Sequence, residues 1–160
     1  MSNTTNYQYI ESPIGKLRLV SDGLALLSIE FEGSHGSEGL EQSDDILQQT
    51  AQQLAEYFSG RRRQFSLPLA AAGTAFQQQV WSALRQIPFG ELRSYRDIAT
   101  EIGNNKAVRA VGAANGRNPI AIVVPCHRVI GSNGSLTGFT GGLAAKRALL
   151  ELEGIDLTAG

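Results

Sequence analysis

The sequence predicts an α+β chain in two parts, a small α/β subdomain followed by a mainly helical domain. Period-two alternation of apolar residues occurs only near the start of the chain, whereas helical spacing dominates from residue 74 onward. The length of 160 residues, 42% of them hydrophobic, suffices for one packed domain or two small ones. We expect the two parts to span residues 1–72 and 73–160.

The first 31 residues indicate antiparallel strands. Residues 16–19 alternate apolar and basic side chains, as a half-buried strand does. Ser21-Asp22-Gly23 is a turn signal, and residues 24–31 form a second apolar run. We therefore expect a hairpin system over residues 7–31. Residues 32–42 contain three glycines and little to pack, which predicts a loop.

A helix is expected after this loop. Ser43 is the candidate N-cap, and the two acidic residues that follow suit the positive end of a helix. The predicted buried face has helical spacing and consists of Leu47, Ala51, Leu54 and Phe58. Gly60 is expected to end the helix, and residues 61–73 to connect the two parts.

The second part begins with three predicted helices. Thr74 is expected to cap the first, whose apolar face (Phe76, Val80, Leu84, Ile87) ends at residues 88–90. Tyr95, Ile98, Ala99 and Ile102 mark a short second helix. Residues 103–105 form a turn, and residues 106–115 the third helix. Two short helices around such a turn fit a helix-turn-helix, although a plain helical hairpin has the same spacing.

The rest of the chain surrounds the single cysteine. Asn118-Pro119 breaks the helical pattern, and residues 120–124 are apolar and β-branched, which predicts a short buried extended segment. Pro125-Cys126-His127-Arg128 follows directly. A glycine-rich loop spans residues 131–142, and a last helix is expected over residues 143–153, ending at Gly154.

The charge distribution is uneven although the formal net charge is −1. Residues 1–60 carry two basic and nine acidic groups, whereas residues 61–160 carry twelve basic and six acidic groups. The basic second part is consistent with attraction of a polyanion such as DNA, but charge also fluctuates along any chain, and charge alone does not decide between these two interpretations. The third predicted helix favours DNA binding, because small residues surround one long cation, Arg109. Such a helix suits close approach to a narrow groove better than base reading in the major groove.

One cysteine excludes an intrachain disulfide and a cysteine-rich zinc site. Chemistry on sulfur requires the thiolate, and a pKa lowered by about two units would make it the major form. His127 is the plausible imidazole base. The nearby carboxylates that could orient it, following the nucleophile–base–orienter pattern, are Glu151, Glu153 and Asp156, and the residues alone do not choose among them. Adjacent side chains in a strand point apart, so a water bridging cysteine and histidine is an alternative to direct contact.

The motif Pro125-Cys126-His127-Arg128-Val129-Ile130 resembles the O6-alkylguanine-DNA alkyltransferases. Arg109-Ala-Val-Gly112 and Asn118-Pro119 before it, and Gly138-Phe-Thr-Gly-Gly-Leu143 after it, resemble the same family. The resemblance is dense over residues 73–155 and weaker over the first 70. It implies a ribonuclease-H-like first subdomain and a winged-helix-like helix-turn-helix second domain that binds DNA and holds the active site.

The resemblance also implies an activity, which is direct-reversal DNA repair. An alkyl group passes once from O6-alkylguanine, and from O4-alkylthymine, to Cys126, after the lesion base leaves the stack. The implied catalytic residues are Cys126 as acceptor, His127 as base through a water, Glu153 as its orienter, Asn118 as hinge and Tyr95, which helps rotate the nucleotide. The implied DNA-binding residues are Tyr95, Arg109, Ala110, Gly112, Ala113 and Arg128, with Arg109 filling the vacated stack. Val129, Phe139 and Thr140 are implied to line the substrate pocket.

Some positions depart from the family pattern. Phe139 stands where many members carry tyrosine, which removes one hydrogen bond to the base. Asn105 replaces a frequent proline in the turn, and Ala121 suggests an open cleft that affects tolerance for bulky alkyl groups.

Four other functions compete with repair. A lesion-binding relative without an acceptor is disfavoured by Cys126. A cysteine hydrolase would turn over an ester or amide without DNA. A thiol redox switch would act between molecules, because the chain has no resolving cysteine. A helix-turn-helix regulator would need dimerisation and base-reading side chains.

Partners and compartment follow from the same residues. We expect double-stranded DNA containing O6-alkylguanine as the partner, and no cofactor, metal or membrane. We expect a monomer, and the sequence leaves open whether copies assemble cooperatively along DNA. The N-terminus has no signal layout and no apolar run spans a bilayer, so a cytoplasmic protein is expected.

Overall fold

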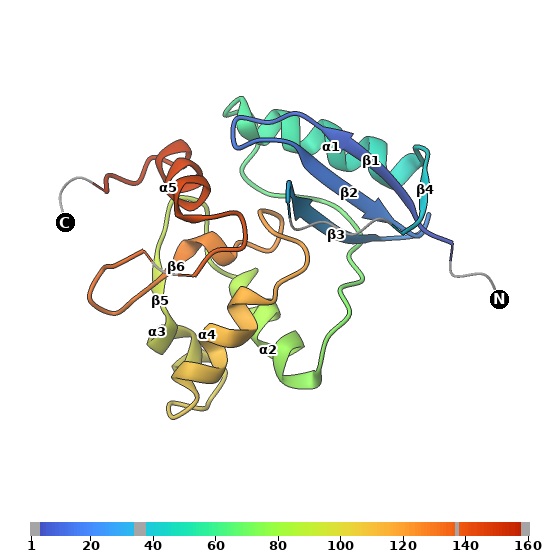
Figure 1. The fold of residues 1–160 in the computed structure, drawn as a ribbon. Helices are drawn as coiled ribbons and strands as arrows, with labels where there is room; N and C mark the ends of the chain where they lie inside the picture. Colours follow the sequence, from blue (N-terminus) through green and yellow to red (C-terminus); the bar gives the residue numbers. More distant parts are fainter. Residues whose placement is uncertain (1–3, 34–37, 137, 158–160) are drawn as a thin grey trace. The chain divides into compact units, whose positions relative to one another are not determined.

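The computed structural model describes residues 4–33, 38–136 and 138–157. The chain divides into two compact units, residues 1–72 and residues 73–160 (Figure 1). Each unit has its own hydrophobic core.

The first unit contains a four-stranded sheet in the order β3-β2-β1-β4. The strands are β1 (Asn6–Ile10), β2 (Leu17–Ser21), β3 (Leu26–Phe31) and β4 (Leu40–Glu41). Both β1–β2 and β2–β3 are antiparallel, which confirms the expected hairpin system. The loop prediction for residues 32–42 was wrong at β4. The N–H of Leu40 donates to the carbonyl of Thr5 at 2.9 Å, and β4 pairs parallel to β1 at the sheet edge.

Helix α1 (Asp45–Phe58) lies across one face of this sheet (Figure 1). Its N-cap is Asp44 rather than the expected Ser43, because the Asp44 carboxylate accepts the N–H of Leu47 at 2.8 Å. An ionised cap also suits the positive end of the helix. The Ser43 hydroxyl instead donates to the side-chain oxygen of Gln8. The buried face consists of Ile46, Leu47, Thr50, Leu54 and Tyr57, and the expected Phe58 is only half-buried.

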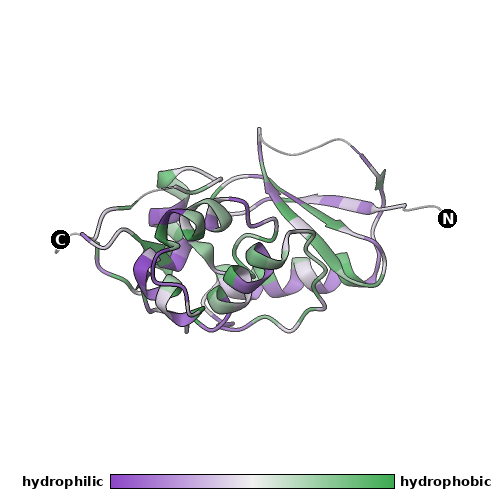
Figure 2. Ribbon diagram, turned by 90° about the horizontal axis from the view of Figure 1, so that it is seen from below, coloured by the Kyte–Doolittle hydropathy of each residue, from purple (hydrophilic) through white to green (hydrophobic). Residues whose placement is uncertain are grey.

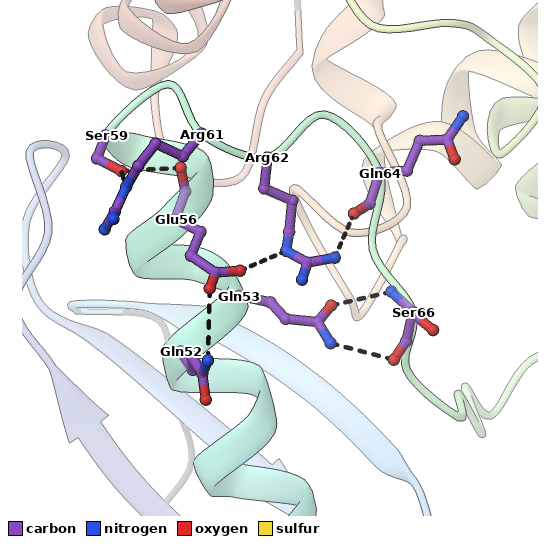
Figure 3. Close-up of polar contacts among 8 residues, drawn as sticks. All are labelled: Gln52, Gln53, Glu56, Ser59, Arg61, Arg62, Gln64 and Ser66. Atoms are coloured by element: carbon purple, nitrogen blue, oxygen red, sulfur yellow. Dashed lines mark hydrogen bonds and ion pairs between the residues drawn. The ribbon is translucent and has the colours of Figure 1, made fainter.

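The connector after α1 stays attached to the first unit (Figure 3). The side-chain amide of Gln53 donates to the carbonyl of Ser66 at 3.2 Å and accepts its N–H at 2.9 Å. Arg62 Nε donates to the Glu56 carboxylate at 2.8 Å. These contacts hold residues 62–66 along α1, so this part of the connector has a fixed course.

The second unit is built around helices α2 (Ala75–Leu84), α3 (Tyr95–Glu101), α4 (Val108–Gly116) and α5 (Leu143–Leu152). Strands β5 (Arg93–Ser94) and β6 (Val129–Ile130) pair in parallel, and a short 3₁₀ helix, η1 (Cys126–Arg128), precedes β6. Figure 2 shows both hydrophobic and hydrophilic residues on the helices, as is typical of amphipathic helices. The expected Thr74 cap is confirmed, and it forms a capping box with Gln77.

Helices α3 and α4 pack against each other as the helix-turn-helix prediction requires. The start of α4 differs from the prediction of residue 106. The N–H of Ala107 donates back to the carbonyl of Asn104 at 3.0 Å, which forms one more turn before the helix begins at Val108.

Residues 120–124 are buried as predicted, but they do not form an extended segment. The chain folds back in a tight turn, in which the N–H of Val124 donates to the carbonyl of Ile120 at 2.9 Å. Ile122 has a φ of 75° inside this turn, a conformation that a β-branched residue rarely adopts. The apolar side chains are buried within a turn that contains an isolated bridge between Ala121 and Val124, rather than in a strand, so the β-branched composition alone misled the prediction.

No helix among the described residues is long and apolar enough to span a bilayer. The same residues contain no group of three or more His, Cys, Asp or Glu side chains placed to hold a metal ion.

Candidate active site

Cys126 lies at the first position of η1, directly after the tight turn. Its N–H donates to the carbonyl of Val124 at 2.8 Å, and its own carbonyl accepts the side-chain amide of Asn115 at 3.4 Å. The residue is only 5% exposed, and its thiol is free. Backbone and side-chain bonds from two segments therefore fix the position of the sulfur.

Asn118 holds the tight turn and reaches the thiol. Its amide donates to the carbonyl of Val124 at 2.8 Å, and its side-chain oxygen accepts the N–H of Ile120 at 3.0 Å. It also forms a hydrogen bond with the Cys126 side chain. One buried side chain thus joins the segment after α4 to the turn before the cysteine, and the hinge role of Asn118 stays a prediction.

His127 is fully buried and pairs with Glu153, at the C-terminal end of α5. The distance between His127 Nε2 and Glu153 Oε2 is 2.7 Å. His127 Nδ1 is buried and has no hydrogen-bond partner among the described residues. Of the three carboxylates that the sequence left open, the structure brings Glu153 to the histidine, whereas Glu151 and Asp156 are exposed.

Arg128, an expected DNA-binding residue, is buried and pairs with Glu153. The residue is 5% exposed, and its Nε and Nη2 donate to the two oxygens of Glu153 at 2.8 and 3.0 Å. Its Nη1 donates to the carbonyl of Ile87 at 2.7 Å. The sequence shows a cation after the cysteine but not that a buried carboxylate pairs with it, and the expected contact of Arg128 with DNA stays a prediction.

Burial sets the protonation of the cysteine and histidine. Desolvation raises the pKa of the Cys126 thiol, outweighing the hydrogen bond from Asn118 and the positive charge of Lys146. Desolvation also lowers the pKa of His127, which outweighs the raising effect of Glu153. The structure therefore holds a thiol beside a neutral imidazole, in place of the expected lowered cysteine pKa.

Lys146 of α5 belongs to this cluster, although sequence reasoning did not single it out. The residue is fully buried, and its Nζ donates to the carbonyl of Val129 at 2.7 Å. Burial lowers its pKa to about 8, while the charge of Cys126 acts to raise it. A signal was present in the sequence, because Lys146 shares a helical face with Leu149 and Leu150.

The predicted DNA-binding residues of α4 lie at the surface. Arg109, Ala110 and Ala113 are exposed, and Gly112 is half-buried. A Cβ added to Gly112 would lie 3.9 Å from Tyr95 Cδ1, which is ordinary contact. Packing inside the fold therefore does not require a glycine at this position.

The remaining predicted residues flank the glycine-rich loop. Tyr95, at the start of α3, points its hydroxyl toward Gly138, where an added Cβ would lie 3.8 Å away. The hydroxyl of Thr140 donates to the carbonyl of Gly116 at 3.2 Å, which ties this loop to the end of α4. Phe139 is half-buried. Val129 is buried, with its carbonyl bound to Lys146.

Two family models match the chain. The ribonuclease-like domain of 6-O-methylguanine DNA methyltransferase matches residues 6–71, and the DNA-binding domain of the same family matches residues 75–155. Together with the observed elements, these matches confirm the predicted fold class.

Curated relatives and solved structures agree with the models. A methylated-DNA–protein-cysteine methyltransferase of Methanosarcina acetivorans is 48% identical, covering 92% of this chain and 97% of that protein. A Mycobacterium tuberculosis protein of the same name is 49% identical, covering 92% of each chain. The crystal structure of M. tuberculosis O6-methylguanine methyltransferase aligns with a TM-score of 0.88 at 46% identity, covering 98% of this chain and 99% of that one. The crystal structure of M. tuberculosis OGT in complex with DNA aligns with a TM-score of 0.87 at 49% identity, covering 92% of each chain. The chain therefore belongs to the 6-O-methylguanine DNA methyltransferase family.

Proposed function

We propose that this chain repairs DNA by direct reversal, taking an alkyl group from O6-alkylguanine, and from O4-alkylthymine, onto Cys126. The Cys126 sulfur attacks the alkyl carbon, so an S–C bond forms while the O6–C bond breaks. The proton that leaves the thiol passes to His127, and the guanine anion gains a proton from a nearby donor. The thioether product is stable, so each chain acts once and needs no cofactor.

A single observation carries this proposal, namely a buried free thiol directly before a buried His127–Glu153 pair, in a unit that also contains a helix-turn-helix. A soft sulfur nucleophile suits displacement at an alkyl carbon. The unpartnered Nδ1 of His127 is the nitrogen available to take the thiol proton through a bridging water. Its neutral state at pH 7 leaves that nitrogen able to act as a base.

The route of the base follows from the residues around the site. A base inside a duplex is out of reach of a buried thiol, so the lesion must leave the stack. We assign Arg109 of α4 to the vacated position and the small residues Ala110, Gly112 and Ala113 to the groove. Tyr95 rotates the nucleotide and donates the proton to the guanine. Val129, Phe139 and Thr140 line the pocket around the base.

The partner in this proposal is double-stranded DNA that carries the lesion. The protein binds it as a monomer, and the proposal is compatible with cooperative binding of several copies along longer DNA. A cytoplasmic location suits the chemistry, because that compartment keeps a lone acceptor thiol reduced.

The decisive test is intact-mass spectrometry after incubation with an oligonucleotide that contains O6-methylguanine. We expect a gain of one methylene per chain, mapped to Cys126. The Cys126→Ala variant is the control, and it should bind the same DNA without any gain in mass. Transfer that persists in this variant would rule out the assigned acceptor.

The assignment of Arg109 has a separate test. Arg109→Ala should slow repair of the lesion in duplex DNA and leave transfer from free O6-alkylguanine base unchanged, because only the duplex contains a stack to fill. Single-turnover rates on both substrates measure this difference. Equal losses on both would contradict insertion into the stack.

A further inference from the structure

All three side-chain nitrogens of Arg128 form hydrogen bonds to groups that surround the site. Its Nε and Nη2 reach the two different oxygens of Glu153, at 2.8 and 3.0 Å, and its Nη1 binds the carbonyl of Ile87 at 2.7 Å. Side chains so fully satisfied and buried seldom move between alternative positions. The guanidinium therefore anchors Glu153 to the segment that follows α2.

Glu153 accepts hydrogen bonds on both oxygens. Oε1 accepts Arg128 Nε and the N–H of Gly90, the latter at 3.1 Å, while Oε2 lies between Arg128 Nη2 and His127 Nε2. A buried carboxylate without a counter-charge is expected to take up a proton, because ionisation in a low-dielectric site is costly. The guanidinium supplies that counter-charge, so Glu153 remains an anion.

The charge of Glu153 decides the tautomer of His127. An ionised carboxylate has no proton to give, so the 2.7 Å contact requires the proton on His127 Nε2. Nδ1 then carries the lone pair, and it is the ring nitrogen without a partner. A protonated Glu153 would donate to Nε2 instead and would leave the proton on Nδ1, which is the wrong arrangement for a base.

We propose that Arg128 is a positioning residue for alkyl transfer, which pairs with both oxygens of Glu153 and thereby fixes His127 as the Nε2–H tautomer with Nδ1 as the base. This inference rests on the proposed function. It gives the cation of the Pro-Cys-His-Arg motif a role inside the site rather than on the DNA.

The other charged groups near His127 leave this assignment intact. Lys146 of α5 faces the pair together with Glu153, and Cys126 and Arg128 lie beside it on η1. Helix α2 also packs on η1 but contains no titratable residue. The positive charges of Arg128 and Lys146 both lower the pKa of His127, whereas Glu153 raises it, so losing Arg128 removes one of the two cations that oppose the effect of Glu153.

The first experiment reads the tautomer directly in the full chain. The sequence has two histidines, so His35→Gln leaves His127 as the only imidazole. Nitrogen-15 NMR of this variant, labelled at histidine, should show a protonated Nε2 and an unprotonated Nδ1 at neutral pH. A proton on Nδ1 would overturn the proposal. This readout requires no alkyl transfer, so it stands apart from the outcome for the repair activity itself.

The second experiment measures single-turnover transfer against pH in Arg128→Met and Arg128→Lys. Arg128→Met should move the acidic midpoint of the rate upward by about one pH unit, because His127 loses a neighbouring cation. Arg128→Lys keeps the charge but loses the two-point geometry, so its midpoint should match the parent while the rate falls. A uniform loss of rate with the parent midpoint in both variants would reduce Arg128 to a structural role. Should Arg128→Met fail to fold, the uncharged polar variant Arg128→Gln replaces it in both the pH profile and the histidine NMR measurement. A parent midpoint together with a proton on His127 Nε2 in that variant would reduce Arg128 to a structural role.

Discussion

At the scale of single residues, Cys126 lies among groups that act on its pKa in opposite directions. Burial raises the pKa of the thiol, while Asn118 and Lys146 lower it. A protonated, buried thiol is protected from unwanted electrophiles, but it must lose its proton when substrate arrives. The positive charge of Lys146 acts to lower the pKa of the thiol and so favours the thiolate.

Lys146→Met tests this electrostatic role. The variant keeps most of the side-chain volume but removes the cation, so less thiolate forms, and we expect transfer at neutral pH to slow by about tenfold, the equivalent of one pKa unit. The pH profile of single-turnover transfer should shift to higher pH. Arg147→Met, at the exposed neighbouring position, is the matched control and should behave as the parent does. An unshifted profile in Lys146→Met would refute the role.

A short motif in the sequence indicates the chemistry of a site, but it does not show which charged side chains are buried. The sequence points to Cys126 and His127, because adjacent thiol and imidazole groups follow an apolar run. It places Arg128 on the DNA and passes over Lys146. Both are cations in the sequence, and only the surrounding side chains show that Glu153 and the Val129 carbonyl take them into the interior.

At the scale of elements, α4 combines a buried side with a surface of small residues. Val111, Ala114 and Asn115 face the interior, and Trp81 Nε1 donates to the carbonyl of Ala114 at 2.8 Å. The opposite side exposes Arg109 and its small neighbours. The buried side of α4 thus anchors the helix in the unit, while its exposed side is available for the proposed contact with DNA.

Gly112→Ala separates folding from DNA binding in this helix. A Cβ at Gly112 meets only Tyr95, at an ordinary 3.9 Å, so the substitution should stabilise the chain by about 1 kcal/mol through helix propensity. The same methyl group would obstruct the proposed approach to the groove and lower DNA affinity. Thermal unfolding and DNA titration measure the two effects. Gly116→Ala, where a Cβ meets nothing within 4 Å, is the control. Unchanged affinity in Gly112→Ala would argue against close approach there.

The start of a helix was predicted correctly where nearby side chains form the capping hydrogen bonds themselves. Thr74 with Gln77 sets the start of α2 from residues three apart. The turn over residues 120–124 was missed because its bonds come from Asn118 and from the turn's own backbone, while β-branched residues suggest a strand. The tight turn over residues 120–124 is favourable only because the rest of the unit buries its apolar side chains.

At the scale of the whole molecule, the buried His127 couples stability to pH. Its pKa in the folded chain is lowered from 6.5, so below this value the unfolded chain binds a proton that the folded chain resists. The stability linked to this group is therefore complete above pH 6.5 and declines as the pH falls.

Urea unfolding at several pH values tests this coupling. As the pH falls below 6.5, the free energy of unfolding should decrease through His127, by at most about 1.4 kcal/mol per pH unit, the limit for one group. His127→Gln should remove this part of the slope, and His35→Gln should retain it. A slope that persists in His127→Gln would assign the effect to other groups.

The sequence by itself determined the α+β class, the helix-turn-helix and the chemistry around Cys126, because hydrophobic periodicity, caps and a short motif are local properties of the chain. Local patterns left three carboxylates open for His127, and the family resemblance implied Glu153. The structure shows the contact itself, because the packing of α5 on η1 brings Glu153 to His127 from 26 positions away. Tertiary structure alone decided that Arg128 and Lys146 are interior charges. The physical reason is that burial and partnership of an ionisable group depend on all the elements around it, and no local pattern records them.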